Sequence, residues 1–250
     1  MTVVGEVPVV VPTDSGQLRG TLVNPDSSAG LVVVFRGVAF SRPKAGDPGY
    51  LGLARDIAAA GFAALYVSFR GFEDAPGVFT MSGWSQDAEA VMAYAAGLGF
   101  ERIALVGASA GAAIALRHVA LHGGVVGVAS LASEALMGQT VPRDYVPEFL
   151  AKVGRAAPTP LAPADPDAFY ADMLAHDPID YVARISPTPV LFVQGDADAF
   201  VSLDTAGRLF EAAAEPKELV VIPGAGHVLR KDPRAVAALI SWLAEVLPTG

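Results

Sequence analysis

The chain has 250 residues, of which 52% are hydrophobic and 17% are charged, and its formal net charge is −9 at pH 7. The length fits one large α/β domain, and the composition predicts a large buried core rather than a disordered chain. The negative charge argues against nucleic acid and anionic membranes as partners, and the lack of cysteine excludes disulfides, thiolate metal sites and cysteine nucleophiles.

The first residues lack a basic segment followed by a secretory cleavage site, and no apolar run reaches the length needed to span a bilayer. We therefore expect a cytoplasmic protein with no membrane partner. We also expect the protein to be a monomer or a homodimer.

The first hundred residues contain short apolar runs, which predict strands, and longer segments that predict helices. Val7–Val11 and Leu18–Val23, joined by a turn at Thr13–Gly16, predict an antiparallel hairpin. Polar loops follow two later strands, at Arg36–Pro43 and Arg70–Gly77. The other elements expected here are strands at Leu31–Phe35 and Phe62–Ser68, a helix at Leu51–Ala60, and a helix capped by Ser85 with Val91, Tyr94, Ala95 and Leu98 on one face.

The pattern of strands and helices continues to the end of the chain, with one interruption. The expected strands are Ile103–Val106, Val125–Leu131, Val190–Gln194 and Leu219–Ile222, and the expected helices are Ala110–Leu121, Leu203–Ala213 and Pro233–Leu247.

The interruption is a proline-rich segment at residues 134–189 with two possible short helices, near Pro147–Val153 and Pro166–Leu174. Its length of roughly 50 residues far exceeds an ordinary connection, which indicates a functional lid or cap inserted into a single domain of residues 1–250.

Strands that alternate with amphipathic helices predict an α/β fold, with a mostly parallel, doubly wound sheet of about eight strands and helices on both faces. In such a sheet, ligands bind beyond the carboxyl ends of the strands. Both polar loops follow strands, so we expect them to lie together at this edge.

The segment Gly107-Ala108-Ser109-Ala110-Gly111 matches G-x-S-x-G, and it lies between a predicted strand and a predicted helix. This is the context of a nucleophile elbow, in which a tight turn lifts the serine clear of the sheet. The small neighbours let strand and helix approach, and the helix N-terminus is directed at an oxyanion formed there. Ser109 is therefore the candidate nucleophile.

A serine nucleophile needs a base and an orienting carboxylate, which the elbow fold predicts in the chain order serine, acid, histidine. His227 follows the last predicted strand in a flexible loop and is the candidate base. After the strand Val190–Gln194, two aspartates compete for the acid position. Asp198 is favoured because it lies further along the turn, whereas Asp196 fits better as a brace for nearby backbone N–H groups.

The chain has three other histidines. His118 and His122 lie on the helix after the elbow, away from its N-terminus, and are interpreted as structural or surface residues. His176 precedes Asp177-Pro178 and is interpreted as a capping or surface residue.

Over nearly its whole length, the chain resembles the α/β-hydrolases, in particular the small esterase and dienelactone-hydrolase-like or peptidase-like branch. The resemblance lies in the serine motif, in Gly195-Asp-Ala-Asp198 with Val201 after it, and in Gly226-His227; Trp84 with Asp87, and Arg70-Gly71, are weaker likenesses. It implies that Ser109 is the nucleophile, Asp198 the acid and His227 the base.

The resemblance also implies an oxyanion hole made by the N–H of the residue after the nucleophile, Ala110, and a second N–H from the loop after the third strand. In that loop Arg36-Gly37-Val38 stands where the family usually has His-Gly-x, which makes Val38 the candidate donor. Arg36 could brace the loop against a nearby carboxylate or meet an acidic group of a substrate, so Arg36 and Gly37 are candidate substrate-binding residues.

These residues predict a serine esterase that cleaves a small or medium acyl substrate through an acyl-enzyme, with no metal and no organic cofactor. The same triad would serve amide or peptide cleavage or acyl transfer, and the absence of an added propeller weighs against long peptides. An alternative of another class is a ligand receptor with a hydrolase fold and little turnover.

Overall fold

The computed structural model describes residues 5–24, 26, 29–41, 44–156 and 165–248. Within these ranges one sheet has the strand order β1-β2-β4-β3-β5-β6-β7-β8, and β2 alone runs against the other strands. The predicted mostly parallel sheet of about eight strands is confirmed. The strands are β1 (Glu6–Thr13), β2 (Gly16–Val23), β3 (Leu31–Phe35), β4 (Ala63–Val67), β5 (Ile103–Ala108), β6 (Gly127–Leu131), β7 (Val190–Gly195) and β8 (Lys217–Ile222).

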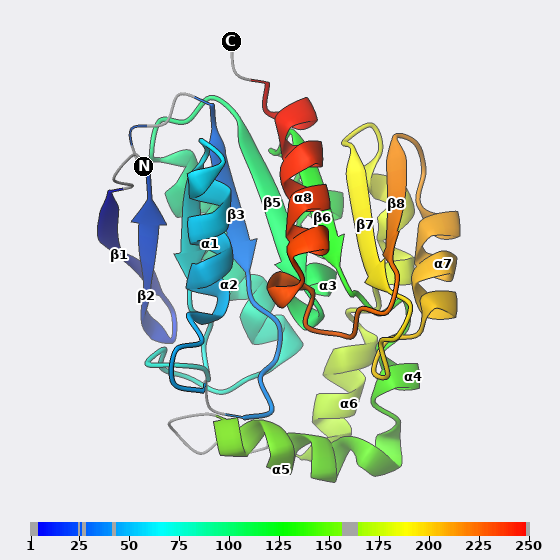
Figure 1. Ribbon diagram of the computed structural model, residues 1–250. Coiled ribbons are helices and arrows are strands. Elements are labelled where there is room, and N and C mark those ends of the chain that lie inside the picture. The colour runs from blue at the N-terminus through cyan, green and yellow to red at the C-terminus, as the bar shows by residue number, and fades with distance from the viewer. Residues whose placement is uncertain (1–4, 25, 27–28, 42–43, 157–164, 249–250) are drawn as a thin grey trace.

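Helices cover both faces of the sheet, as predicted (Figure 1). The α-helices are α1 (Gly49–Ala59), α2 (Met81–Ala96), α3 (Ala110–His122), α4 (Met137–Thr140), α5 (Val146–Ala156), α6 (Pro166–Leu174), α7 (Leu203–Ala212) and α8 (Pro233–Val246). Four 3₁₀ helices complete the described elements: η1 (Arg143–Tyr145), η2 (Pro178–Asp180), η3 (Val182–Ile185) and η4 (Leu229–Lys231).

The core has two layers because successive side chains of a strand point to opposite faces. Leu53 of α1 and Leu239 of α8 pack on one face of the sheet. Val91 of α2, Ile114 of α3 and Leu209 of α7 pack on the other. The central strands are buried along their whole length, which explains why their sequences are apolar runs rather than alternating patterns.

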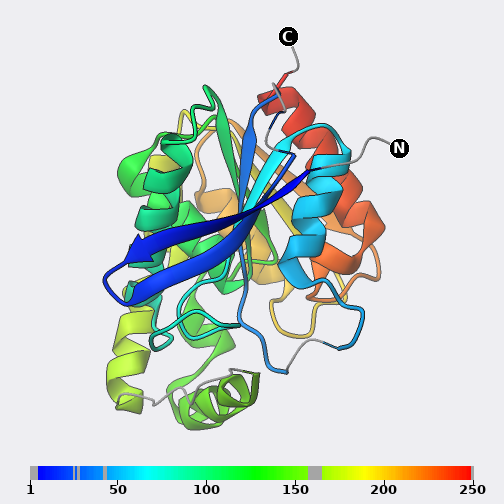
Figure 2. The same ribbon diagram turned by 90° about the vertical axis from the view of Figure 1, so that its left-hand side faces the viewer.

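The central strands end level with one another. Phe35 of β3 pairs with Gly107 of β5, which in turn pairs with Ser130 of β6. The segments that follow these strands therefore meet at one edge of the sheet. The helices α4, α5 and α6, which we call the cap, lie beyond that edge (Figures 1 and 2). Residues 42–43, at the end of the first predicted polar loop, lie outside the described ranges.

The cap occupies the connection between β6 and β7, and residues 157–164 of it lie outside the described ranges. Helices α5 and α6 confirm the two predicted short helices. His176, just after α6, is buried, and its Nδ1 lies 2.7 Å from the carbonyl oxygen of Asp172 in the last turn of that helix. The capping interpretation of His176 is therefore right, and the surface alternative is wrong.

The predicted N-cap of α2 is wrong. The helix begins at Met81, and Thr80 is its cap, since the Thr80 hydroxyl accepts the Gly83 N–H at 2.9 Å. Thr80 has the extended backbone that lets a cap side chain fold back on the first turn. Ser85 lies inside the helix and is buried. Leu98 follows the end of the helix but still packs against the core.

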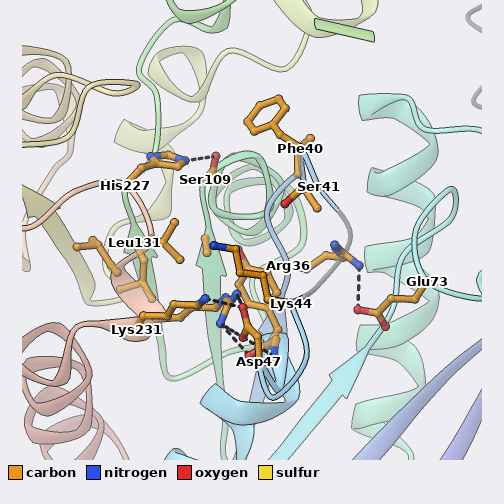
Figure 3. Close-up of a pocket in the computed structure, with 18 residues that line it drawn as sticks. Arg36, Phe40, Ser41, Lys44, Asp47, Glu73, Ser109, Leu131, His227 and Lys231 are labelled. Atoms are coloured by element: carbon orange, nitrogen blue, oxygen red, sulfur yellow. Dashed lines mark hydrogen bonds and ion pairs between the residues drawn. The ribbon is translucent and has the colours of Figure 1, made fainter. Parts of the chain in front are cut away.

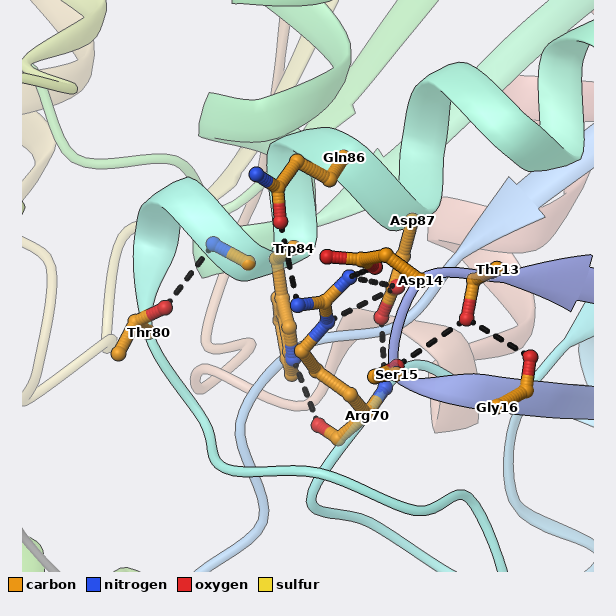
Figure 4. A network of polar contacts seen from close by, with 10 residues as sticks. Thr13, Asp14, Ser15, Gly16, Arg70, Thr80, Trp84, Gln86 and Asp87 are labelled. Atoms are coloured by element: carbon orange, nitrogen blue, oxygen red, sulfur yellow. Dashed lines mark hydrogen bonds and ion pairs between the residues drawn. The ribbon is translucent and has the colours of Figure 1, made fainter.

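A network of ion pairs centred on the buried side chain of Arg70 joins the N-terminal hairpin, the loop after β4 and α2 (Figure 4). The Arg70 guanidinium donates to Asp87 at 2.8 and 2.9 Å and to Asp14 at 2.8 Å. The backbone N–H of Arg70 also donates to Asp87 at 2.7 Å, and the indole N–H of Trp84 donates to the Arg70 carbonyl at 3.0 Å. The weaker likenesses at Arg70-Gly71 and at Trp84 with Asp87 thus belong to one structural network.

We predict that Asp87→Ala lowers the free energy of unfolding by about 3–5 kcal/mol, because it leaves the buried Arg70 charge without its main partner. Asp14→Ala removes a carboxylate from the same guanidinium, but the Asp14 side chain is 64% exposed, so the expected loss is below about 1 kcal/mol. Equilibrium unfolding in urea measures both. Equal losses in the two variants would contradict this account of the network.

Candidate active site

Ser109 lies in the turn between β5 and α3, and its backbone is strained. Its φ is 52° and its ψ is −127°, a conformation that residues other than glycine rarely adopt. A Cβ at Gly107 would lie 2.4 Å from the Gly111 carbonyl oxygen, and a Cβ at Gly111 would lie 2.1 Å from the Arg36 carbonyl oxygen. Only glycine fits at both positions, so the spacing of the motif follows from close backbone packing.

The structure brings Ser109, His227 and Asp198 together. Nε2 of His227 lies 3.0 Å from the Ser109 Oγ (Figure 3), and Nδ1 lies 2.8 Å from an Asp198 carboxylate oxygen. Ser109 follows β5, Asp198 follows β7 and His227 follows β8. With the Nδ1 proton donated to Asp198, Nε2 is the acceptor for the Ser109 hydroxyl.

Asp198 is held by the backbone of its own turn. Its Oδ1 accepts the N–H groups of Phe200 and Val201 at 2.8 and 2.9 Å. Burial alone would raise its pKa, but hydrogen bonds from His227 and from these N–H groups outweigh burial and lower the pKa. Asp196, the competing aspartate, instead accepts the Gly224 N–H at 2.6 Å and braces the loop that carries His227.

His227 is largely buried, and burial by itself lowers a histidine pKa. The hydrogen bond to Asp198 and the charge of that carboxylate act in the opposite direction, with a smaller contribution from Glu134, and the net effect raises the pKa of His227. The imidazole is therefore a stronger base than a free histidine, and its orientation is fixed.

The two candidate oxyanion donors lie beside Ser109. Ala110 is the first residue of α3, and Val38 lines the cavities next to the serine. Among the described residues, neither backbone N–H has a hydrogen-bond acceptor. A Cβ at Gly37 would lie 3.1 Å from the Ser109 Cβ, so the absence of a side chain there lets the loop pass close to the serine.

Arg36 braces the loop that carries Val38. Its guanidinium donates to Glu73 at 3.0 Å and to the Gly37 carbonyl at 3.2 Å, and it lies 4.5 Å from the centre of the Phe72 ring. Only 5% of Arg36 is exposed. Of the two roles that the sequence allows, these contacts fit the loop-bracing one.

Glu134 is a residue near Ser109 that sequence reasoning did not assign to the site. It is 6% exposed, and among the described residues its Oε2 has no hydrogen-bond partner. It lines an apolar cavity together with Ser109, and burial raises its pKa. The available signal was its position three residues after β6, at the edge where the other site residues gather.

The remaining histidines lie away from this site. His118 is buried, and its ring centre lies 4.8 Å from that of His122, whose Nε2 is 3.6 Å from Glu89 on α2. Within the described ranges, no group of three or more histidine and carboxylate side chains is arranged to hold a metal ion. In the same part of the chain, no helix combines the length and apolarity needed to cross a bilayer.

The chain is similar in sequence and in structure to known proteins. The family model described as "Alpha/beta hydrolase family" matches residues 32–239. Uncharacterized protein Rv2307c of Mycobacterium tuberculosis is 32% identical over 226 residues, which cover 88% of this chain and 71% of that protein.

Two solved structures share the fold at 18% sequence identity. The alpha/beta hydrolase GrgF from Penicillium sp. sh18 has a TM-score of 0.76, with 98% of this chain and 100% of that chain covered. The Pyrococcus furiosus esterase Pf2001 has a TM-score of 0.74, with 98% of this chain and 94% of that chain covered.

We predict that Asp198→Asn lowers the pKa of His227, because the carboxylate that offsets burial is lost. Asp196→Asn is the matched control, since it changes an aspartate two residues away that contacts Gly224 rather than the imidazole. NMR titration of the His227 ring measures the pKa in both variants. An equal shift in the two, or no shift in Asp198→Asn, would contradict the assignment of Asp198 as the partner of His227.

Proposed function

The chain belongs to the alpha/beta hydrolase family, and on that premise we propose that it is a serine hydrolase that cleaves carboxylic esters through an acyl-enzyme. One observation carries the proposal. A serine on a strained turn at a helix N-terminus is hydrogen-bonded to a largely buried histidine, which is hydrogen-bonded in turn to an aspartate whose side chain is buried. This arrangement fits the activation of a hydroxyl that is otherwise a weak nucleophile at neutral pH.

In the proposed reaction the Ser109 Oγ attacks the acyl carbonyl carbon while His227 Nε2 takes the hydroxyl proton. The N–H groups of Ala110 and Val38 stabilise the oxyanion, with the N-terminus of α3 adding a favourable dipole. Collapse of the intermediate breaks the bond to the alcohol, which receives the proton from His227. In the second half-reaction, His227 takes a proton from water, which attacks the acyl carbon. The bond to Ser109 then breaks, the acid is released and the serine regains its proton from His227. Asp198 stabilises the imidazolium in both half-reactions.

The acyl group is assigned to the smaller of two cavities beside Ser109. This cavity has a volume of about 30 Å³ and is lined by apolar side chains of the cap and the body, among them Phe149, Met173 and Phe200. Ala110, one of the proposed oxyanion donors, also lines it. An apolar cavity of this size supports a preference for short acyl groups.

We predict that a fluorophosphonate adds once to the wild-type protein and not at all to Ser109→Ala, as read by intact mass. Ser109→Ala should also lower kcat/KM for aryl esters by about 10³-fold or more. Ser130→Ala is the control, because Ser130 is a buried serine on the neighbouring strand with no hydrogen-bond partner for its hydroxyl among the described residues.

An adduct that persists in Ser109→Ala would contradict the assignment of the nucleophile. A wild-type protein that reacts with the fluorophosphonate, but that turns over an ester only once and retains the product, would favour the ligand-receptor alternative. Faster cleavage of matched anilides than of esters would favour an amidase on the same residues.

We predict that Met173→Ala shifts the preference among 4-nitrophenyl esters toward longer acyl chains, because it enlarges the apolar cavity. Met92→Ala is the matched control, since Met92 is equally a buried methionine but lies on α2 and does not line the cavity. Both variants should lose about 2–5 kcal/mol of stability, so kinetics are measured well below their melting temperatures. The same chain-length profile in both variants would overturn the assignment of the acyl group to this cavity.

A further inference from the structure

The two cavities that meet at Ser109 differ in character. The smaller is the apolar cavity described above, and the larger, of about 320 Å³, has walls rich in charged side chains (Figure 3). His227 lines the larger cavity and not the smaller. His227 donates a proton to the departing alcohol oxygen, so that oxygen must lie within hydrogen-bond reach of the imidazole. The alcohol half of an ester is therefore expected on the side of the larger cavity.

The larger cavity carries an excess of positive charge, although the chain as a whole has a net charge of −9. Among the described residues, its charged lining apart from His227 consists of the cations Arg36, Lys44, Arg230 and Lys231 and the anions Asp47 and Glu73. Four cations against two anions leave two positive charges uncompensated beside the nucleophile.

The ion pairs show how the two carboxylates are shared among the four cations. Arg36 is paired with Glu73 at 3.0 Å. The Arg230 guanidinium donates to both carboxylate oxygens of Asp47, at 2.9 and 3.0 Å. The Lys231 Nζ lies 2.5 Å from one of the same two oxygens, so the single charge of Asp47 serves two cations. Lys44 has no ion pair within the described ranges.

The two lysines also have room to bind a ligand. Lys44 is exposed and the Lys231 side chain is 51% exposed, whereas Arg36 and Arg230 are largely buried against their partners. The hydrogen bonds from Arg230 and Lys231 lower the pKa of Asp47, so this carboxylate stays ionised and holds the segment from Leu229 to Lys231 against the loop before α1. A cleft whose lining carries an excess of one sign of charge concentrates the electric field, because the surrounding protein has a low dielectric constant.

We propose that the larger cavity is the alcohol subsite and that it selects esters whose alcohol carries an anionic group, a carboxylate or a phosphate, held by Lys44 and Lys231. The inference rests on the proposed ester hydrolysis and names its substrate class: a short apolar acyl group on an anionic alcohol. In the reaction the Ser109 Oγ–carbon bond forms, the carbon–alcohol oxygen bond breaks, and the serine proton passes through His227 to that oxygen. The anionic group is bound but unchanged.

The test compares two esters with the same acyl group, 4-butanoyloxybenzoate, which is anionic, and 4-butanoyloxybenzamide, which is neutral. Each kcat/KM is divided by the rate of hydroxide hydrolysis of the same ester, so that leaving-group reactivity cancels. We expect the wild type to favour the anionic ester by about tenfold at low salt, and the preference to fall as ionic strength rises.

The double variant Lys44→Gln/Lys231→Gln should reduce the anionic-to-neutral ratio by about five- to tenfold. The matched control is Arg102→Gln/Arg184→Gln, which removes two positive charges that precede β5 and β7, at the opposite edge of the sheet. An equal fall in the control would mean that net charge, and not this subsite, sets the preference, and would overturn the inference.

Other outcomes separate the inference from the proposed function. A wild type that hydrolyses both esters with a ratio of one or less would overturn the inference and leave the function standing. A lysine-dependent preference for 4-nitrophenyl hemiglutarate over 4-nitrophenyl pentanoate would place the anion in the acyl half and overturn the assignment of the alcohol. Faster cleavage of 4-butanoyloxyphenyl phosphate than of the benzoate would support the subsite and identify phosphate as the anion.

Calorimetry on Ser109→Ala gives a readout that does not depend on turnover. We expect 4-hydroxybenzoate to bind more tightly than 4-hydroxybenzamide, and the difference to disappear when Lys44 and Lys231 are replaced as well. If no ester is cleaved, lysine-dependent anion binding would uphold the subsite while the hydrolase proposal fails. Equal binding of the two phenols would overturn the subsite.

Discussion

The close approach of β5, α3 and the loop after β3 is the constraint on which the site depends. Gly107, Gly111 and Gly37 are each pressed against backbone, so no side chain fits at these positions without displacing a neighbour. This packing holds Ser109 at a positive φ and offsets the cost of that conformation, which is about 1–3 kcal/mol for such a residue. It also brings the backbone of the loop after β3 next to the serine. The same packing therefore determines the position of the nucleophile and that of a candidate oxyanion donor.

Two buried carboxyl groups near His227 have opposite environments. Asp198 receives hydrogen bonds from backbone N–H groups and from the imidazole, and its pKa is lowered, whereas Glu134 is buried among apolar side chains with an unpartnered oxygen, and its pKa is raised. The difference in pKa follows from hydrogen bonding and not from depth, since both groups are buried. Asp198 is therefore the carboxylate whose charge is stabilised opposite His227, while burial disfavours the charged form of Glu134.

The sheet, its helices and the three residues at Ser109 could be predicted because each rests on a local pattern or on chain order. Apolar runs locate the buried strands, and the G-x-S-x-G spacing reflects packing within a few residues. The cap of α2 was mispredicted because Thr80 and Ser85 are both suitable cap residues, and only the backbone distinguishes them. Glu134, Lys44 and Lys231 were missed because they are far apart in the sequence, and each reaches a cavity beside Ser109 only when the chain has folded.

The cap supplies apolar side chains to the smaller cavity, while polar contacts hold the cap in place. The Asp172 carboxylate of α6 accepts the Met81 N–H at 2.7 Å as well as the backbone N–H and hydroxyl of Ser82, so a cap residue satisfies the N-terminus of a body helix. Within the cap, the Asp177 carboxylate accepts the N–H of Met137, the first residue of α4, at 2.6 Å. Because hydrogen bonds are directional, the Asp172 contacts orient α6 against the N-terminus of α2, and the Asp177 contact orients the start of α4 against the segment after α6. Cap side chains line the apolar cavity, whereas none of the described residues of α4, α5 and α6 lines the charged cavity.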